Sequence, residues 1–514
     1  MKIKNIPTSK IIIGIICIAG IIATIVRFTK GLGAVTNLSD KFPWGLWVGF
    51  DVLCGVALAA GGFVMTASVY LFNLKRYKPL LRPTILTAFL GYILVSTGLI
   101  FDLGKPWNIW HPLIMWNTRS VMFEVAWCVM LYSTVLTLEF SPVIFERLRM
   151  ETAQRLIHAI EIPIVIAGVI LSTLHQSSLG TVFLIVPGKL HELWYTPILP
   201  ILFFISAVTV GFAMIIFESY ISSKIFHRGL KFSLLTELGS FLIIALLLYL
   251  AIKFQDLIRR GALKDLFSGS IESIFFIGEI LLLLVPMISL MFKRVHLSRF
   301  GLFLCSLSVI VGVMLNRLNV SIVGMMRSSG VFYFPSLGEI TISVFLLTVG
   351  VVVFILADKH LPIFPEEEEE EKMLPMKKIV GAAAGAVILL ISLPLFAENP
   401  QSADNEQPSS TNVRIKKLSI DDRKSVEPPD FVIYQTKYKK GTQIKFNHRI
   451  HARDYGLKCI ECHHVEKCAH CHGEETSPMM VEESKIALHE TCMGCHRAIE
   501  SGPRKCDDCH KQVE

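Results

Sequence analysis

One pattern of cysteine and histidine occurs four times between residues 459 and 510, each copy reading C-x-x-C-H. Two thiols at this spacing add across the vinyl groups of haem, and the His directly after the second Cys ligates the iron. The pattern therefore predicts four covalently bound c-type haems. The motif residues are Cys459, Cys462 and His463; Cys468, Cys471 and His472; Cys492, Cys495 and His496; and Cys506, Cys509 and His510.

Zinc knuckles are the alternative interpretation, because C-x-x-C also forms zinc sites. Zinc does not need a His directly after every second Cys, so the pattern favours haem. Two His ligands for each of four irons require four further histidines, and the stretch supplies five. Ligation by His in place of Met keeps the haem potential low, as expected of an electron-transfer domain. The five further histidines are His448, His451, His464, His470 and His489.

Residues 446–510 resemble the class III (cytochrome c3-like) multihaem cytochromes. The matching residues are Phe446-Asn-His448-Arg-Ile-His451, the doubled His463-His464, and His489 before the third motif. The gap between the first two motifs is shorter than in the usual tetrahaem members, so His470 is an alternative to His464 at haem 2. The resemblance implies that the distal ligands of haems 1, 2, 3 and 4 are His448, His464, His451 and His489.

A domain this small, at residues 436–514, is expected to pack around its haems, since so short a chain cannot bury a conventional core. Haem is attached covalently outside the cytoplasm. The C-terminus is therefore predicted to lie on the periplasmic side of a bacterial inner membrane, and this placement fixes the orientation of the rest of the chain.

The remainder of the chain is strongly apolar. The 514 residues are 52% apolar and 18% charged, and the mean hydropathy is +0.55. Long apolar runs at this composition indicate a polytopic membrane protein. The formal charge of +8 is spread through loops, which argues against nucleic-acid binding. Four cysteines inside apolar runs are predicted to be packing residues rather than disulfides or ligands: Cys17, Cys54, Cys128 and Cys305.

The apolar runs predict an all-α fold, a polytopic helical bundle of ten spans plus one anchor span, with the cytochrome domain appended. Eleven spans and a periplasmic C-terminus place the N-terminus in the cytoplasm. The predicted inner loops also carry more Lys and Arg than the outer ones, as the positive-inside rule expects. The spans are 10–27, 47–74, 83–103, 119–143, 157–182, 196–221, 232–253, 271–292, 299–318, 338–357 and 379–397.

The bundle and the cytochrome are joined by three segments. Residues 358–378 form an acidic cytoplasmic linker whose glutamate run is interpreted as a solvated charge cluster. Residues 379–397 have the layout of a secretory signal; we favour an uncleaved anchor, and cleavage is the alternative. Residues 398–435 are rich in Pro, Ser, Asn and Gln and are interpreted as a flexible periplasmic tether.

Ionisable residues inside membrane spans are costly and are candidates for function. Several lie toward the predicted outer ends of their spans, on the same side as the haems. The alternative is that they are interfacial residues, since span ends collect polar side chains. The candidates are Asp51, Asp102, Glu124, His175 with Gln176, and Asn316 with Arg317.

Residues 1–357 resemble the NrfD/PsrC family, and specifically its HybB-like branch, the membrane subunit of some nickel–iron hydrogenases. The resemblance implies a haem-free, quinone-reactive helical bundle whose pocket opens to the outer face, where an iron–sulfur subunit docks. The matching stretches are Pro43-Trp-Gly-Leu-Trp-Val-Gly-Phe-Asp51, Gly55-Val-Ala-Leu-Ala-Ala-Gly-Gly62, Phe101-Asp-Leu-Gly-Lys-Pro-Trp107, Met122-Phe-Glu-Val-Ala-Trp-Cys128 and Leu174-His-Gln-Ser-Ser-Leu-Gly180.

Quinone exchange moves two protons with two electrons, so the site needs an acid or base. We hypothesise that His175 and one of Asp51, Asp102 or Glu124 bind the quinone head and transfer protons. Arg317 is expected to stabilise the reduced anion or to hold a carboxylate. Four further carboxylates are expected either to form a proton route to the cytoplasm or to pair helices: Glu161, Glu218, Glu237 and Glu279.

Together these features predict a membrane subunit that passes electrons between a periplasmic dehydrogenase, c-type haems and menaquinone. The expected dehydrogenase is a nickel–iron hydrogenase with its iron–sulfur subunit. The alternative is a non-catalytic anchor that only displays the cytochrome. A transporter finds little support, because no pair of helices resembles an inverted repeat with broken midplane segments.

Overall fold

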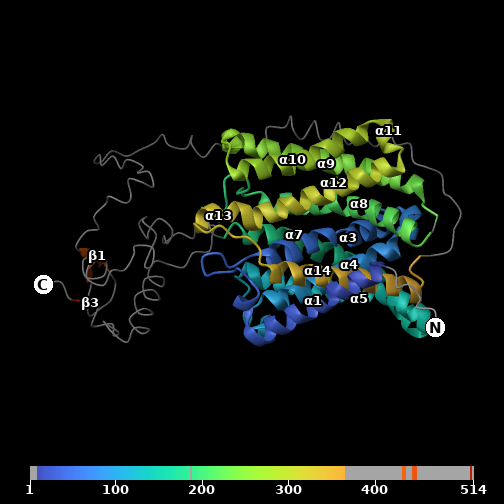
Figure 1. Ribbon diagram of the computed structural model, residues 1–514, viewed down its shortest axis with the longest axis horizontal. Helices are drawn as coiled ribbons and strands as arrows, with labels where there is room; N and C mark the ends of the chain where they lie inside the picture. Colours follow the sequence, from blue (N-terminus) through green and yellow to red (C-terminus); the bar gives the residue numbers. More distant parts are fainter. Residues whose placement is uncertain are drawn as a thin grey trace. The chain divides into compact units, whose positions relative to one another are not determined.

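A computed structural model describes residues 8–185, 188–227, 229–364, 431–435, 443–447 and 510–511. The chain divides into two compact units, Met1–Ala397 and Glu398–Glu514. The described residues of the first unit form a bundle of long helices (Figure 1). Those of the second form three short strands.

Ten helices of the first unit are long and apolar enough to cross a membrane. They confirm the first ten predicted spans, and the predicted anchor at 379–397 lies outside the described residues. The spans run over Lys10–Lys30, Trp47–Leu71, Lys75–Asp102, Val121–Leu148, Glu161–Val182, Leu199–Ile225, Phe232–Arg260, Ile271–Met291, Arg299–Ser329 and Leu337–His360.

Most spans are single α-helices, whereas the second and ninth are composite and contain π-helical segments. The second span combines η2 (Trp47–Cys54), α2 (Gly55–Leu58), α3 (Gly61–Thr66) and η3 (Ala67–Leu71), and the ninth combines α12 (Arg299–Leu318), η8 (Asn319–Val323) and α13 (Gly324–Ser329). The other helices are α1 (Thr8–Lys30), α4 (Lys78–Asp102), α5 (Val121–Leu148), α6 (Glu151–Ala159), α7 (Glu161–Val182), α8 (Leu199–Ile225), α9 (Phe232–Arg260), α10 (Ile271–Met291), α11 (Lys293–His296) and α14 (Leu337–His360).

Four helix starts, those of α5, α10, α12 and α14, are capped by serines in the loops that precede them. Ser270 Oγ accepts a hydrogen bond from the backbone N–H of Ser273 at the start of α10. Ser298 Oγ accepts one from the backbone N–H of Gly301 at the start of α12. Ser336 and Glu339 form a reciprocal capping box at the start of α14. These bonds satisfy N–H groups that the helix itself leaves free.

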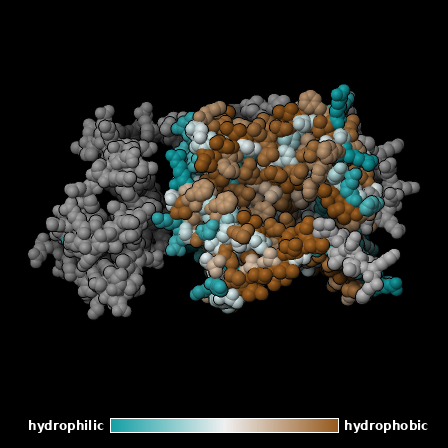
Figure 2. Space-filling model, in the orientation of Figure 1, coloured by the Kyte–Doolittle hydropathy of each residue, from teal (hydrophilic) through white to brown (hydrophobic). Residues whose placement is uncertain are grey.

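The side of the bundle is apolar, with hydrophilic residues gathered at its two ends (Figure 2). Isoleucines of α1 such as Ile15 and Ile18 are each 62% exposed. Large apolar side chains exposed on the side of the bundle suit contact with lipid. The backbone N–H and C=O groups form their hydrogen bonds within each helix and need no water. The surface therefore agrees with an integral, multi-pass membrane protein.

Neighbouring helices pack in a chain through the bundle: α5 on α7, α7 on α8, α8 on both α9 and α12, and α12 on α10. Because successive spans are antiparallel, their loops meet at two ends. One end carries α6 and the start of α4, and we call it the α6 end. The other carries the loops at 31–46, 103–120, 183–198, 261–270 and 330–336, and we call it the opposite end.

The ninth span is longer than predicted. We expected it to stop at residue 318, which placed Asn316 and Arg317 at a span end. Instead η8 and α13 continue it to Ser329, so both residues lie near the middle of a 31-residue span. The prediction of their depth is wrong because a π-helical segment carries the polar sequence onward without ending the helix.

The all-α fold class is confirmed for the membrane unit, and the second unit adds a small antiparallel sheet. Strand β1 (Phe431–Gln435) pairs with β2 (Gln443–Asn447), and β2 pairs with β3 (His510–Lys511). In the register of β2 and β3, Ile444 lies opposite His510. The sheet thus brings the start of the predicted haem-binding stretch beside its last motif. The domain boundaries at 357, 378, 397 and 435 stay predictions.

Candidate functional site

His175 of α7 lies fully buried in the bundle, 0% exposed. Its Nδ1 is 2.8 Å from the phenol oxygen of Tyr92 on α4. The Tyr92 ring in turn stands edge-on to Tyr132 of α5, with ring centroids 4.6 Å apart. The neighbouring Gln176 donates from Nε2 to the carbonyl of Val56 in the second span, at 3.1 Å. Four spans therefore converge on this histidine.

Four polar atoms around His175 are buried, and none has a hydrogen-bond partner outside this group among the described residues. They belong to Tyr132 (Oη) and Ser172 (Oγ), which interact with each other, and to His175 (Nε2) and Gln176 (Oε1). A buried polar atom without a partner costs about 1–3 kcal/mol, and native proteins rarely leave several together. We refer to these side chains with Tyr92 as the His175 site; their unpaired atoms suit a polar ligand or ordered water.

The His175 site offers both hydrogen-bond donors and acceptors. If Tyr92 donates to Nδ1, then Nε2 carries the proton of the neutral imidazole and is a donor; the other tautomer makes Nε2 an acceptor. Hydroxyls such as those of Tyr132 and Ser172 also serve either role. An arrangement of this kind can bind both a carbonyl and the hydroxyl to which it is reduced.

Glu124 is connected to the same face of α7. Its carboxylate accepts a hydrogen bond from Ser178, and Ser178 lies three residues after His175. Residues at this spacing share one face of a helix. Glu124 lies four residues into α5 from the opposite end and is exposed. Of the predicted carboxylates, it is the one whose recorded hydrogen bond leads to the helix of His175.

Asp51 and Asp102 belong to a different group of residues. Asp51 lies in the π-helical segment η2 and accepts a 2.6 Å hydrogen bond from Ser343 of α14. Asp102 ends α4 beside Arg27, whose Nε and Nη2 donate to the carbonyls of Phe101 (2.8 Å) and Leu103 (2.6 Å). These contacts attach α1 and α14 to the bundle near the opposite end.

Arg317 lies in a second polar cluster, formed by α8, α9, α10 and the ninth span. Its Nη2 donates to Ser206 at 2.8 Å, its Nη1 donates to Asn316 at 2.8 Å, and its guanidinium lies 3.7 Å from the Phe203 ring centre. That Arg317 stabilises a reduced quinone or holds a carboxylate stays a prediction; among the described residues its hydrogen bonds run to Asn316, Ser206 and the carbonyl of Phe203.

Glu279 is the centre of this second cluster. Its carboxylate is 0% exposed and forms an ion pair with Lys253 of α9. It also accepts hydrogen bonds from Trp194 (3.0 Å), Asn316 (2.9 Å) and Asn319 (3.0 Å). Four donors, one of them the Lys253 cation, satisfy this carboxylate, so it suits a structural role better than a proton carrier.

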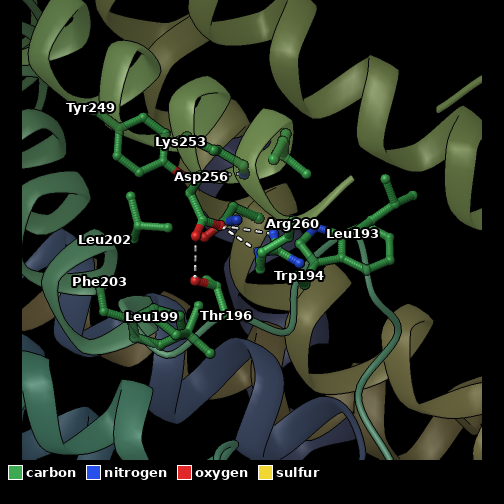
Figure 3. A pocket seen from close by; sticks show the side chains of 12 residues that line it. Leu193, Trp194, Thr196, Leu199, Leu202, Phe203, Tyr249, Lys253, Asp256 and Arg260 are labelled. Atoms are coloured by element: carbon green, nitrogen blue, oxygen red, sulfur yellow. Dashed lines mark hydrogen bonds and ion pairs between the residues drawn. The ribbon is translucent and has the colours of Figure 1, made fainter. Parts of the chain in front are cut away.

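A narrow pocket adjoins the second cluster from the opposite end (Figure 3). Asp256 lies between Thr196 and Arg260, accepting hydrogen bonds of 2.9 and 2.8 Å from them. Lys253 and Tyr249 line the same pocket. The sequence reasoning missed Lys253, although a lysine at the end of an apolar run was a signal for it. Tyr92 and Tyr132 carried no such signal, because buried tyrosines look like ordinary core residues.

The predicted haem residues lie almost wholly outside the described residues. Only His510 falls in a described element, β3, and nothing is described of its side chain. Among the described residues, no group of three or more His, Cys, Asp or Glu side chains is arranged to hold a metal. Cys17, Cys54, Cys128 and Cys305 are free thiols, in agreement with their prediction as packing residues. The outlying motif residues are Cys459, Cys462, His463, Cys468, Cys471, His472, Cys492, Cys495, His496, Cys506 and Cys509, and the outlying distal histidines are His448, His451, His464 and His489.

The fold and the buried polar site define a polytopic helical membrane protein. Residues 34–328 match the family model described as "Polysulphide reductase, NrfD", and residues 429–511 match the class III cytochrome c family. The chain therefore belongs to the NrfD family and carries a c-type cytochrome domain.

Three relatives of known sequence cover most of the membrane unit. A protein of Nitratidesulfovibrio vulgaris is 40% identical over 371 residues, 69% of this chain and 94% of its own length. The "probable Ni/Fe-hydrogenase 2 b-type cytochrome subunit" of Escherichia coli is 33% identical, covering 70% and 94%. The "menaquinone reductase, integral membrane subunit" of N. vulgaris is 28% identical, covering 68% and 89%.

Proposed function

We propose that this protein is the quinone-reactive membrane subunit of a respiratory oxidoreductase, and that menaquinone reacts at the His175 site. The observation that supports it most is the set of buried, unpaired polar atoms around His175. A quinone head presents two carbonyl oxygens, which can accept hydrogen bonds from donors among these groups. A menaquinone reductase subunit among the relatives supports the same substrate.

The electron carriers in this proposal are four haems c bound by the C-terminal motifs. Haem c supplies one-electron transfer, and the eight motif cysteines and eight histidines are the donor set it requires. Among the described residues, His175 is the one histidine away from the end of a span. The spans thus lack the pair of axial histidines that a b-type haem would need, despite the name of the E. coli relative.

The proposed partner is a periplasmic dehydrogenase, a nickel–iron hydrogenase with its iron–sulfur subunit. The hydrogenase subunit of E. coli among the relatives supports this class of partner. In the same proposal the α6 end faces the cytoplasm and the opposite end faces the periplasm with the cytochrome domain. Lysines and arginines cluster at the α6 end, for example Lys75, Arg76, Lys293 and Arg294.

The test is electron exchange between menaquinone and the haems of the purified full-length chain, followed by haem absorbance. We expect menaquinol or menaquinone to change the haem redox state, and His175→Ala to abolish this exchange while the haem spectrum stays native. Exchange by His175→Ala at the native rate would remove the His175 site from the proposal. No exchange in the native chain would favour a non-catalytic anchor.

A further inference from the structure

A cavity of about 330 Å³ opens in the first half of the bundle at the α6 end. It lies between the end of the second span, the starts of α4 and α7, the last third of α5, and α6. Its polar lining includes Tyr70, Lys78, Arg82, Glu139 and Glu161. A volume of this size holds on the order of ten water molecules. We call it the inner cavity.

Pro142 helps to shape the inner cavity. Proline inside α5 cannot donate to the carbonyl of Leu138 one turn earlier, and the hydroxyl of Ser141 donates to that carbonyl instead, at 2.8 Å. The backbone is disturbed directly beside Glu139, which lies nine residues from the α5 end at Leu148. Glu139 is therefore about 13 Å inside the span.

Glu139 differs from most carboxylates at this end of the bundle. Glu237 is held by an ion pair with Arg76 and a 2.7 Å hydrogen bond from Tyr77, and Glu161 accepts from Tyr70. Among the described residues, no basic side chain or hydrogen-bond donor is recorded for Glu139. A buried carboxylate without a cation is free to take up and release a proton, whereas a paired one is held in the charged form.

Polar groups continue from Glu139 toward the His175 site along the contact of α5 and α7. A methyl group placed on Gly168 would lie 3.2 Å from Oε1 of Glu139 and 3.8 Å from the Tyr132 ring, so the two side chains meet over this glycine. Gly168, Ser172 and His175 follow at helical spacing on one face of α7. The Tyr132 and Ser172 hydroxyls, which interact with each other, lie on this line.

We propose that the inner cavity and Glu139 deliver protons to the His175 site from the α6 end. The proposal rests on the proposed function. Reduction of one quinone consumes two electrons and two protons and gives one quinol. The electrons come from one-electron carriers on the opposite side, and the protons come through the inner cavity. Each turnover then moves charge across the membrane; oxidation of quinol would run the same path in reverse.

The carboxylates that line the inner cavity favour a proton path over a binding site for an anion. An anionic lipid headgroup in the inner cavity would meet Lys78 and Arg82, but also Glu139 and Glu161. Arg82 is already occupied by Glu146 at 2.8 Å and by the carbonyl of Pro362 at 2.9 Å. A proton path needs an unpaired carboxylate and water molecules between the groups that exchange protons. The inner cavity therefore suits water better than it suits a phosphate group.

The experiment uses the full-length chain in liposomes that contain a menaquinone with a short tail. Dithionite, added outside, reduces only the outward-facing haems, and protein-free liposomes correct for direct quinone reduction. The pH of the lumen and of the outer buffer are set separately. For the native protein we expect the rate of quinone reduction to follow the lumen pH.

Two pairs of variants give matched comparisons. Glu139→Gln is expected to lower quinone reduction at least about tenfold and to remove its dependence on lumen pH, with the quinone KM unchanged. Glu151→Gln, an exposed carboxylate at the same end that does not line the cavity, is expected to behave as native. Gly168→Ala is expected to slow turnover, whereas Gly61→Ala, whose added methyl would lie 3.2 Å from the side chain of Thr84, is not.

The outcomes separate this inference from the proposed function. A rate that follows only the outer pH, or native behaviour of Glu139→Gln, overturns the proton path while quinone turnover that depends on His175 stands. Absence of quinone turnover in the native chain overturns the proposed function and the proton path with it. If Glu139→Gln unfolds or loses the native haem spectrum, Glu139→Asp takes its place in the test. This variant keeps the carboxylate and is expected to retain most of the activity.

Discussion

The phenol oxygen of Tyr92 lies 2.8 Å from Nδ1 of His175, and both side chains are buried. This hydrogen bond holds the ring orientation of the histidine. Tyr92→Phe removes it and leaves Nδ1 without a partner, at a cost of about 1–3 kcal/mol. We expect quinone turnover to fall about tenfold, since about 1.4 kcal/mol corresponds to a factor of ten. The rate of steady-state quinone reduction by Tyr92→Phe and by the native protein measures this fall.

The matched control for that prediction is Tyr249→Phe. This residue also loses a buried hydroxyl, but it lies in the second cluster, where it accepts from Lys253 at 3.3 Å. Equal losses of turnover in both variants would show that the effect comes from general destabilisation rather than from the orientation of His175.

The carboxylates Glu124 and Asp51 are expected to respond differently to substitution. Glu124 bonds to Ser178 on the helix of His175, whereas Asp51 bonds to Ser343 on α14. We expect Glu124→Gln to lower quinone turnover by about tenfold or more, and Asp51→Asn, which keeps an acceptor for Ser343, to change it by less than about threefold. Loss of activity in Asp51→Asn with normal activity in Glu124→Gln would assign the acid–base role to Asp51.

The ion pair of Lys253 and Glu279 is expected to be structural. Lys253→Met leaves the Glu279 carboxylate buried without its cation and should lower the free energy of unfolding by about 3–5 kcal/mol. The double variant Lys253→Met/Glu279→Gln removes both charges and should recover most of that loss. Thermal unfolding of the detergent-solubilised protein measures both. A double variant no more stable than Lys253→Met would refute the pair as the reason for the loss.

Haem content is expected to follow the motif count. The purified chain should contain four haems, counted by the pyridine haemochrome spectrum, and Cys492→Ser/Cys495→Ser should contain three. Cys305→Ser, a free thiol of the membrane unit, should retain all four. Bound zinc in place of haem would make the motifs zinc knuckles instead.

His296, the last residue of the short helix α11 between α10 and α12, is expected to make stability depend on pH. Burial lowers its pKa below the ordinary value, and its Nε2 lies 3.3 Å from Ser240 Oγ. The unfolded chain therefore binds a proton more readily than the folded one. The contribution to stability is complete above the ordinary pKa of about 6.5 and is lost as the pH falls below it. Thermal unfolding from pH 7.5 to pH 5.5 should show this loss in the native protein and a weaker one in His296→Gln.

The number and order of the membrane spans could be predicted from the sequence, because hydrocarbon thickness fixes the length of an apolar helix. The depth of Arg317 could not, since a π-helical segment continues the ninth span through polar residues. The importance of His175 could be predicted from the cost of burying an ionisable group. Its partners Tyr92 and Tyr132 could not, because which buried tyrosines meet a histidine depends on how α4, α5 and α7 pack.

The second polar cluster also bears on how the protein enters the bilayer. A helix that carries Asn316, Arg317 and Asn319 through its centre is poorly soluble in lipid by itself, and so is α9 with Lys253 or α10 with Glu279. The polar groups of each span find their partners only when all three spans have met in the bilayer. A truncation between spans seven and nine would therefore leave Lys253 or Glu279 in the hydrocarbon without its counter-charge, and the assembly of these helices is expected to proceed as one step.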